Sequence, residues 1–155
     1  MDLPGVDAVL IANEPGATYE GTVYDRWITL RHSSGRTLRV FDMSCATGDL
    51  SVGSRRFWVL RVSFPEEAAV LDATPTPAIE PGDWIGTIVA LNWLAPAQPL
   101  ALVGAEPTRG QVVIETDVGH VMLDPRDVPG ARVGATITWR GGRWDLIGAA
   151  LIDPG

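Results

Sequence analysis

The chain contains an internal repeat, and this repeat restricts the folds that it can adopt. The segment Glu14–Val23, EPGATYEGTV, aligns with Glu80–Ile88, EPGDWIGTI, when one residue of slack is allowed. Later in the two halves the match needs no gap, and Trp58 corresponds to Trp139 at a spacing of 81 positions that neighbouring glycines and alanines share. Self-similarity at a fixed spacing indicates a duplicated structural unit.

The repeat predicts two small units rather than one large domain. We expect a first unit over residues 14–72, a proline-rich linker over residues 73–79 and a second unit over residues 80–153. The linker alternates proline with threonine and alanine, which favours a stiff, extended connection. The second unit carries an inserted loop over residues 92–110. Because units of about 60 residues are marginally stable alone, we expect the two to share an interface.

Short segments rich in β-branched and aromatic residues predict β-hairpins in both halves. In the first half, Arg26–Arg31 and Thr37–Phe41 flank a run of turn residues. In the second half, Val112–Thr116 and His120–Leu123 flank a shorter turn at the corresponding place. Near the end of the chain, Gly141–Gly142 predicts a further tight hairpin turn.

These signals predict an all-β protein of two tandem small β-barrels that arose by internal duplication. The barrels would be of the oligonucleotide-binding (OB-like) or SH3-like kind, and closure would remove exposed strand edges. The alternative is one larger barrel or sandwich to which both halves contribute strands. Only Asp7–Ala12 and Glu66–Leu71 have a helical pattern, and both segments are short.

Charge and cysteine content bear on compartment and partners. The formal net charge is −7, and all 12 basic residues are arginine. The single Cys45 cannot form an internal disulfide, and the first residues have no basic segment ahead of their short apolar run. No apolar run in the sequence is long enough to cross a bilayer. We therefore expect a cytoplasmic protein that does not associate with membranes.

Catalysis, metals and cofactors receive little support from the residue pattern. The two histidines and the single cysteine have no metal-ligand spacing, and the sequence contains no phosphate-binding loop or hydrolase motif. Cys45, His32 and Asp42 are the candidates for a nucleophile, a base and an orienting acid, but their spacing does not favour that role. We predict no catalytic residue, no metal site and no cofactor, and we favour a protein that is not an enzyme.

The inserted loop of the second half offers the first candidate binding site. Trp93 and Leu94 stand in a proline-punctuated segment, and Arg109 lies in its stem. Since aromatic and arginine residues dominate the energetics of protein interfaces, these three residues are predicted to contact a protein partner or a second copy of the chain. An inhibitor or immunity-type factor would act in this way. The alternative is that Trp93 folds back over an open barrel end.

An arginine-rich aromatic surface in the first half is the second candidate. Strand alternation can place several cations and rings on one outward face. Its predicted members are Trp27, Arg31, Arg39, Phe41 and Arg56. Such a face would bind single-stranded nucleic acid or an oligosaccharide by stacking and charge contacts. The overall acidity, with a sequence pI of about 4.7, opposes binding to a polyanion, so this function is the alternative to a protein partner.

Overall fold

The computed structural model describes residues 3–48, 50–71, 82–94, 100–104, 107 and 109–152. Within these residues nearly all regular structure is β-strand, and the one helical element is a single 3₁₀ turn, η1 (Pro125–Asp127). The predicted all-β fold is therefore confirmed. None of the described ranges contains a helix that is both long enough and apolar enough to span a bilayer.

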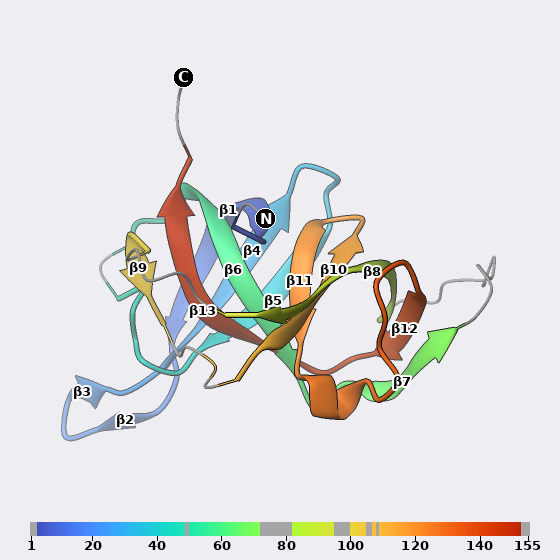
Figure 1. Cartoon of the computed structure of the whole chain (residues 1–155). Coiled ribbons are helices and arrows are strands. Elements are labelled where there is room, and N and C mark those ends of the chain that lie inside the picture. Colours follow the sequence, from blue (N-terminus) through green and yellow to red (C-terminus); the bar gives the residue numbers. More distant parts are fainter. Residues whose placement is uncertain are drawn as a thin grey trace.

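Five strands close into a barrel (Figure 1). They are β1 (Val6–Pro15), β4 (Arg26–His32), β5 (Thr37–Asp42), β6 (Arg55–Ser63) and β13 (Arg143–Leu151). Around the barrel, β6, β1, β4 and β5 pair antiparallel in that order, β5 pairs parallel with β13, and β13 pairs antiparallel with β6. The predicted small barrel is confirmed, and the strand that closes it comes from the second half of the chain.

The other long strands form a second lobe beside the barrel (Figure 1). They are β7 (Glu66–Leu71), β8 (Asp83–Trp93), β10 (Gln111–Thr116), β11 (Gly119–Leu123) and β12 (Thr136–Arg140). β12, β8, β10 and β11 pair antiparallel in that order, β11 pairs parallel with the end of β6, and β7 pairs antiparallel with β12. The short strands β2 (Thr18–Tyr19) and β3 (Thr22–Val23) form a projecting arm, and β9 (Leu102–Val103) pairs with β13.

One long antiparallel ladder runs through both lobes. β6 is followed directly by β7, and β12 is followed directly by β13. The pairing therefore extends from Arg56 opposite Leu151 in the barrel to Leu71 opposite Thr136 in the second lobe. Each lobe is thus completed by the end of a strand that begins in the other, which ties the two lobes together.

Gly141 and Gly142 do not form the predicted hairpin turn. β12 and β13 pair with different strands, and the two glycines connect them where the long ladder passes between the lobes. Both glycines have positive φ, but a Cβ on Gly142 would also lie 2.6 Å from Cγ1 of Val62 and 3.1 Å from the carbonyl oxygen of Ser63. The close approach of a neighbouring strand, rather than a turn, explains Gly142.

The two segments with a helical pattern, Asp7–Ala12 and Glu66–Leu71, are strands, so the helical interpretation is wrong. The first belongs to β1, which pairs on both edges, with β4 and with β6. Its alternate side chains Val6, Ala8 and Leu10 are buried in the barrel. The second is β7, which pairs with β12. Ladder hydrogen bonds and burial outweigh the weak helix preference of alanine and leucine in such short segments.

The two predicted hairpins are confirmed. β4 and β5 pair from Arg26 opposite Asp42 to Arg31 opposite Thr37, and β10 and β11 pair across a tight turn. The inward side chains of both hairpins belong to the main hydrophobic core. That core also contains the repeat-equivalent tryptophans, Trp58 and Trp139, which are 0% and 1% exposed.

A second apolar cluster lies between the lobes. Val59 on β6 and Ile147 on β13 point out of the barrel, and they pack against Val113 on β10 and Met122 on β11. All four side chains are fully buried. This shared interface removes apolar surface that each small lobe would otherwise expose.

The beginning of the repeat alignment does not match the structure. Glu14–Val23 covers the end of β1 and the β2–β3 arm, whereas the described part of Glu80–Ile88 is the start of β8. In the first copy of the Glu-Pro-Gly sequence, Glu14 and Pro15 end β1, whereas in the second the described Gly82 precedes β8. The spacing of 81 later in the chain does not depend on this segment.

Candidate ligand-binding face

The outward side of the β4–β5 hairpin carries cations and aromatic rings. Alternate residues of the hairpin are buried in the barrel, namely Ile28, Leu30, Leu38 and Val40. The residues between them point outward, and the register places Trp27 opposite Phe41 and Thr29 opposite Arg39. Three of the five residues proposed from the sequence, Trp27, Arg39 and Phe41, are therefore neighbours on one face.

Five side chains form a continuous row on this side of the barrel. In order, they are Arg39, Trp27, Phe41, Arg143 and Phe64, and we call this row the cation–aromatic face. The guanidinium carbon of Arg39 lies 4.4 Å from the centre of the Trp27 ring, and the Trp27 and Phe41 ring centres are 4.9 Å apart. The guanidinium carbon of Arg143 lies 4.9 Å from the centre of Phe41 and 5.4 Å from that of Phe64. These distances permit cation–π and ring–ring attraction along the row.

Asp145 fixes the position of Arg143. The Asp145 side chain is only 2% exposed, and its carboxylate accepts hydrogen bonds from Nε and Nη2 of Arg143 at 2.7 and 3.2 Å. The hydroxyl of Ser63 donates to the same carboxylate, and Nη2 of Arg61 lies 3.7 Å from it. Because a bidentate contact sets the plane of a guanidinium group, the rings beside Arg143 rest on a rigid surface.

Phe64 ends the row in an unusual state for a large apolar side chain. It is 73% exposed, and its backbone has a φ of +57°. A bulky residue in the left-handed region carries a conformational cost of about 1–3 kcal/mol. Strain that holds an aromatic ring in solvent favours a contact with a ligand over a role in packing.

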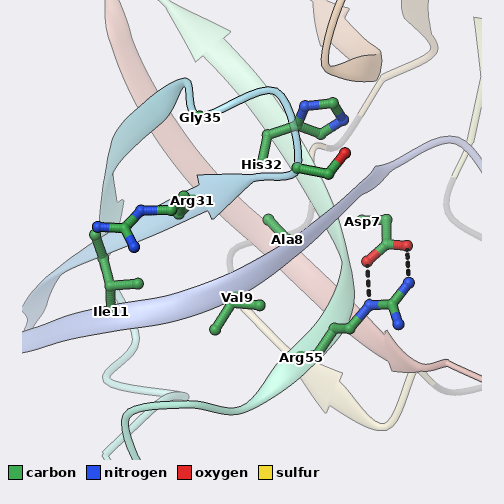
Figure 2. A pocket seen from close by; sticks show the side chains of 9 residues that line it. Asp7, Ala8, Val9, Ile11, Arg31, His32, Gly35 and Arg55 are labelled. Atoms are coloured by element: carbon green, nitrogen blue, oxygen red, sulfur yellow. Dashed lines mark hydrogen bonds and ion pairs between the residues drawn. The ribbon is translucent and has the colours of Figure 1, made fainter.

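A groove continues this surface along β1 and β4. It has a volume of about 370 Å³, and its lining residues are Asp7, Ala8, Val9, Ile11, Arg31, His32, Ser33, Gly35 and Arg55 (Figure 2). Arg31 enters it from β4, two positions beyond Thr29 on the outward side. In the part of the chain that the structure describes, the Arg31 guanidinium has no ion-pair partner.

The groove also contains an ion pair. Nε and Nη2 of Arg55 donate to the two carboxylate oxygens of Asp7 at 2.9 and 2.6 Å (Figure 2). The hydrogen bond from Arg55 holds the pKa of Asp7 below its usual value of 3.8, although burial acts in the opposite direction. The Asp7 side chain is 44% exposed and that of Arg55 is 60% exposed. Solvent therefore screens the ion pair, which stabilises the fold only slightly.

Arg56 does not join the cation–aromatic face. It lies opposite Leu151, at the end of β13 that is far from Arg143. On β6, Arg56 lies on the same face of the strand as the buried Trp58 and on the opposite face from the outward Arg55. Its Nε atom is buried without a hydrogen-bond partner among the described residues.

The residues proposed for a protein partner lie at the end of β8 and in the loop after it. Trp93 is half-buried and packs against the apolar cluster between the lobes, whereas Leu94 is 60% exposed. Nε of Arg109 lies 3.7 Å from the carboxylate of Asp124. Residues 95–99, 105–106 and 108 of the same insertion lie outside the described residues.

Asp124 is held by its neighbours in the structure. Burial would raise the pKa of its carboxyl group, but hydrogen bonds from the side chain and backbone of Arg126, with the charges of Arg126 and Arg109, keep that pKa below 3.8. The carboxylate also caps η1 by accepting a hydrogen bond from the backbone N–H of Arg126. The contact between Arg109 and Asp124 is therefore part of a structural ion-pair network.

The residues considered for catalysis are not assembled. Asp42 lies opposite Arg26 at one end of the β4–β5 hairpin, whereas His32 ends β4 at the other. Asp42 accepts hydrogen bonds from two backbone N–H groups and from the Thr47 hydroxyl, and it thereby closes the corner that contains Cys45. Across the described ranges, no three His, Cys, Asp or Glu residues group in a way that could hold a metal ion.

Arg143, Asp145 and Phe64 belong to the site but were not among the residues proposed from the sequence. The hairpin turn predicted at Gly141–Gly142 would have paired the strand of Arg143 with β12 and not with strands of the first half. Its place beside Phe41 depends on the parallel pairing of β5 with β13, which joins segments about 100 residues apart and has no local sequence signal. The alternation of Arg143 and Asp145 was the one visible sign that both side chains share a face.

Comparisons with models of known protein families, with curated proteins and with solved structures find no match to this chain.

Proposed function

We propose that the protein is a non-catalytic binding module and that its cation–aromatic face binds single-stranded nucleic acid. The observation that carries this proposal is the row of three rings and two guanidinium groups, fixed at Arg143 by a buried carboxylate. Rings and guanidinium planes stack on bases of any sequence. Arg31 and Arg39 have no ion-pair partner in the described ranges, so both are available to phosphate groups.

The order of the barrel strands supports an OB-like interpretation. Numbered along the chain, the five strands follow the order 1-2-3-5-4, and strand 3 is parallel to strand 5. OB-folds are five-stranded Greek-key barrels that bind oligonucleotides on the face of their second and third strands. Here those strands are β4 and β5, which carry Trp27, Arg39 and Phe41. The cation–aromatic face therefore lies where this kind of barrel binds its ligands.

We also propose that the second lobe is a duplicate of the barrel unit. Leu10 in β1 exchanges two backbone hydrogen bonds with Gly53–Ser54, and Ile88 in β8 does the same with Gly134–Ala135. The antiparallel order β6, β1, β4, β5 in the barrel matches the antiparallel order β12, β8, β10, β11 in the second lobe. In each lobe the last strand of this order then pairs parallel with the next strand, β5 with β13 and β11 with β6. On this proposal the first unit begins with β1, and the two OB-like units exchange the ends of their long strands.

The negative net charge limits how a polyanion can bind. At physiological ionic strength, charges more than about 8 Å away are largely screened, so the cations within the site outweigh distant acids there. Of the arginines on the cation–aromatic face and in the adjoining groove, Arg31 and Arg39 are those without an ion-pair partner in the described ranges, so stacking is expected to supply most of the affinity. Their unpaired guanidinium groups favour a phosphate-bearing strand over a neutral oligosaccharide. We retain the cytoplasm as the expected compartment.

Fluorescence anisotropy with labelled oligothymidylate and oligouridylate tests the proposal. The wild type should bind at low and at physiological salt. Trp27→Ala should weaken binding about 5- to 150-fold, because stacking contributes about 1–3 kcal/mol per base. Arg39→Ala should also weaken it, whereas the control Arg132→Ala removes an exposed arginine from the second lobe and should leave the Kd within about twofold. The absence of wild-type binding at low salt would contradict the proposal.

A protein partner at Trp93, Leu94 and Arg109 is the second candidate function. The observation that favours it is the 60% exposure of Leu94 directly after the half-buried Trp93, together with the 44% exposure of Leu91 on the same strand. For a second copy of the chain, the test is sedimentation velocity over a range of concentrations. An oligomer that Leu94→Asp dissociates would support this site, and a monomer at every concentration would contradict self-association.

A further inference from the structure

The groove between β1 and β4 has polar groups at both ends and an apolar middle. Figure 2 shows the Arg31 side chain over Ile11 at one end and His32 toward the other, where Asp7 and Arg55 also lie. Ala8 and Val9 lie between these ends (Figure 2). A volume of about 370 Å³ falls at the small end of ligand sites in proteins, which suits one nucleotide better than two.

Several hydrogen-bond donors remain available in the groove. Nδ1 of His32 accepts a hydrogen bond from the backbone N–H of Ser34 at 3.1 Å, so the neutral ring carries its proton on Nε2. Arg55 uses Nε and Nη2 on Asp7, which leaves Nη1 free of that contact. Arg31 has no ion-pair partner in the described part of the chain. The donors therefore favour an anionic ligand.

The groove is continuous with the cation–aromatic face. Trp27, Thr29 and Arg31 are successive outward residues of β4, spaced about 7 Å apart. A strand stacked on Trp27 and following β4 would reach the groove at Arg31. The acid of the groove, Asp7, lies beyond that point and would repel a further phosphate, so the path for a polyanion ends there.

Building on the proposed function, we propose that this groove holds the terminal nucleotide of the bound strand. Its phosphate contacts the Arg31 guanidinium, its base lies against Val9 and Ile11, and the Nε2–H of His32 donates to the polar edge of the base. The site would then recognise the end of a strand, whereas the cation–aromatic face binds its interior.

Oligothymidylates that carry a 5′-phosphate, a 3′-phosphate or neither test this inference by anisotropy. One of the two phosphorylated forms should bind about 10-fold more tightly than the unphosphorylated strand, as expected for one charge-assisted contact. Which form gains also gives the direction of the strand. Arg31→Ala should abolish this gain, whereas Trp27→Ala should weaken all three oligonucleotides and keep it. Arg132→Ala, which removes an exposed arginine of the second lobe, is the matched control and should change neither quantity.

Two outcomes overturn the inference while leaving the cation–aromatic face intact. They are a wild type that gains nothing from either terminal phosphate, and a gain that persists in Arg31→Ala. Thermal melting of Arg31→Ala excludes unfolding as the cause of any loss, because Arg31 is exposed and should not stabilise the fold.

If no oligonucleotide binds, the proposed function fails, and the groove is then tested separately by titrating thymidine monophosphate. Chemical-shift changes at Ile11 and His32 that are lost in Arg31→Ala would keep the groove as a site for a single nucleotide. Unchanged spectra at millimolar nucleotide would overturn that as well.

Discussion

The hairpins β4–β5 and β10–β11 occupy corresponding places in the pairing order of the two lobes but carry opposite outer surfaces. Where the first hairpin has Thr29 opposite Arg39, the second has Val113 opposite Met122. Val113 and Met122 are fully buried between the lobes, whereas Arg39 is exposed and lies over Trp27. One hairpin joins the lobes, and the other is left free to meet a ligand.

This difference indicates where a function can reside in a molecule whose two lobes share an order of strand pairing. The inward side chains of both hairpins are apolar and fill the core, so they are constrained by packing alone. The outward side chains are constrained only where something covers them. An exposed outward face with rings, unpaired arginines and one rigid anchor is therefore the part that packing does not explain.

The largest expected effect comes from exchanging the two surfaces. Met122→Arg places an unpaired charge in the buried cluster between the lobes and should destabilise the protein by about 3–5 kcal/mol or prevent folding. The reciprocal change Arg39→Met removes an exposed side chain and should alter stability by no more than about 0.5 kcal/mol. Urea denaturation measures both. Equal losses for the two variants would contradict the contrast between the hairpins.

A smaller effect is expected when the anchor of the first face is removed. Asp145→Asn keeps the shape of the side chain but takes away the buried charge that holds Arg143, and it should cost about 1–3 kcal/mol and weaken oligonucleotide binding. Asp117→Asn is the matched control. Asp117 lies in the turn of the second hairpin, is 60% exposed and forms an ion pair with Arg36 of the first hairpin. Its effect should stay below about 1 kcal/mol. A loss in the control as large as that in Asp145→Asn would argue against a special role for the anchor.

The salt dependence of binding should be shallow. Two phosphate contacts, at Arg31 and Arg39, predict a slope of log K against log salt of about −1.4, at roughly −0.7 per contact for a single strand. Arg39→Ala should reduce the slope to about −0.7. Glu115→Arg adds a cation to the second hairpin, at the place that corresponds to Arg31, and should leave the slope unchanged. A steep wild-type slope would indicate nonspecific attraction instead.

The smallest expected effect concerns the pH dependence of stability at the groove. The folded pKa of Asp7 is lowered by Arg55, so its stabilising contribution is present above the unfolded pKa of about 4 and is lost as the pH falls through the folded value. Asp7→Asn should therefore melt slightly below the wild type near pH 7, and the two should converge once the pH falls below the folded pKa of Asp7. Because the pair is largely exposed, the difference should be small. A gap that widens toward acid pH would have the wrong sign.

The sequence was sufficient for the features that depend on local pattern. Alternation along Arg26–Arg31 and Thr37–Phe41 predicts the hairpin, its buried side and the outward grouping of Trp27 with Phe41. The repeat-equivalent tryptophans, Trp58 and Trp139, both lie in the core. Strand period and turn chemistry determine these features within a few residues of one another.

The features that depend on distant pairing could not be predicted in this way. The residues around a glycine pair do not show whether it forms a hairpin turn or connects two strands that pair with other partners, as Gly141–Gly142 does between β12 and β13. The position of Arg143 was therefore not predicted. The segment Asp7–Ala12 has a weak helical pattern that is overruled by pairing with two strands far away in sequence. In a small barrel, closure decides both outcomes, and closure is a property of the whole chain.

The most direct test of the ligand-binding face is a titration of isotope-labelled protein with oligothymidylate, followed through the indole N–H signals of its six tryptophans. We predict a saturable shift of the Trp27 signal, with backbone shifts at Arg39 and Phe41, and no change at the core residues Trp58 and Trp139. A Trp27 signal that stays unchanged at millimolar oligonucleotide and low salt would contradict the proposal that this face binds single-stranded nucleic acid.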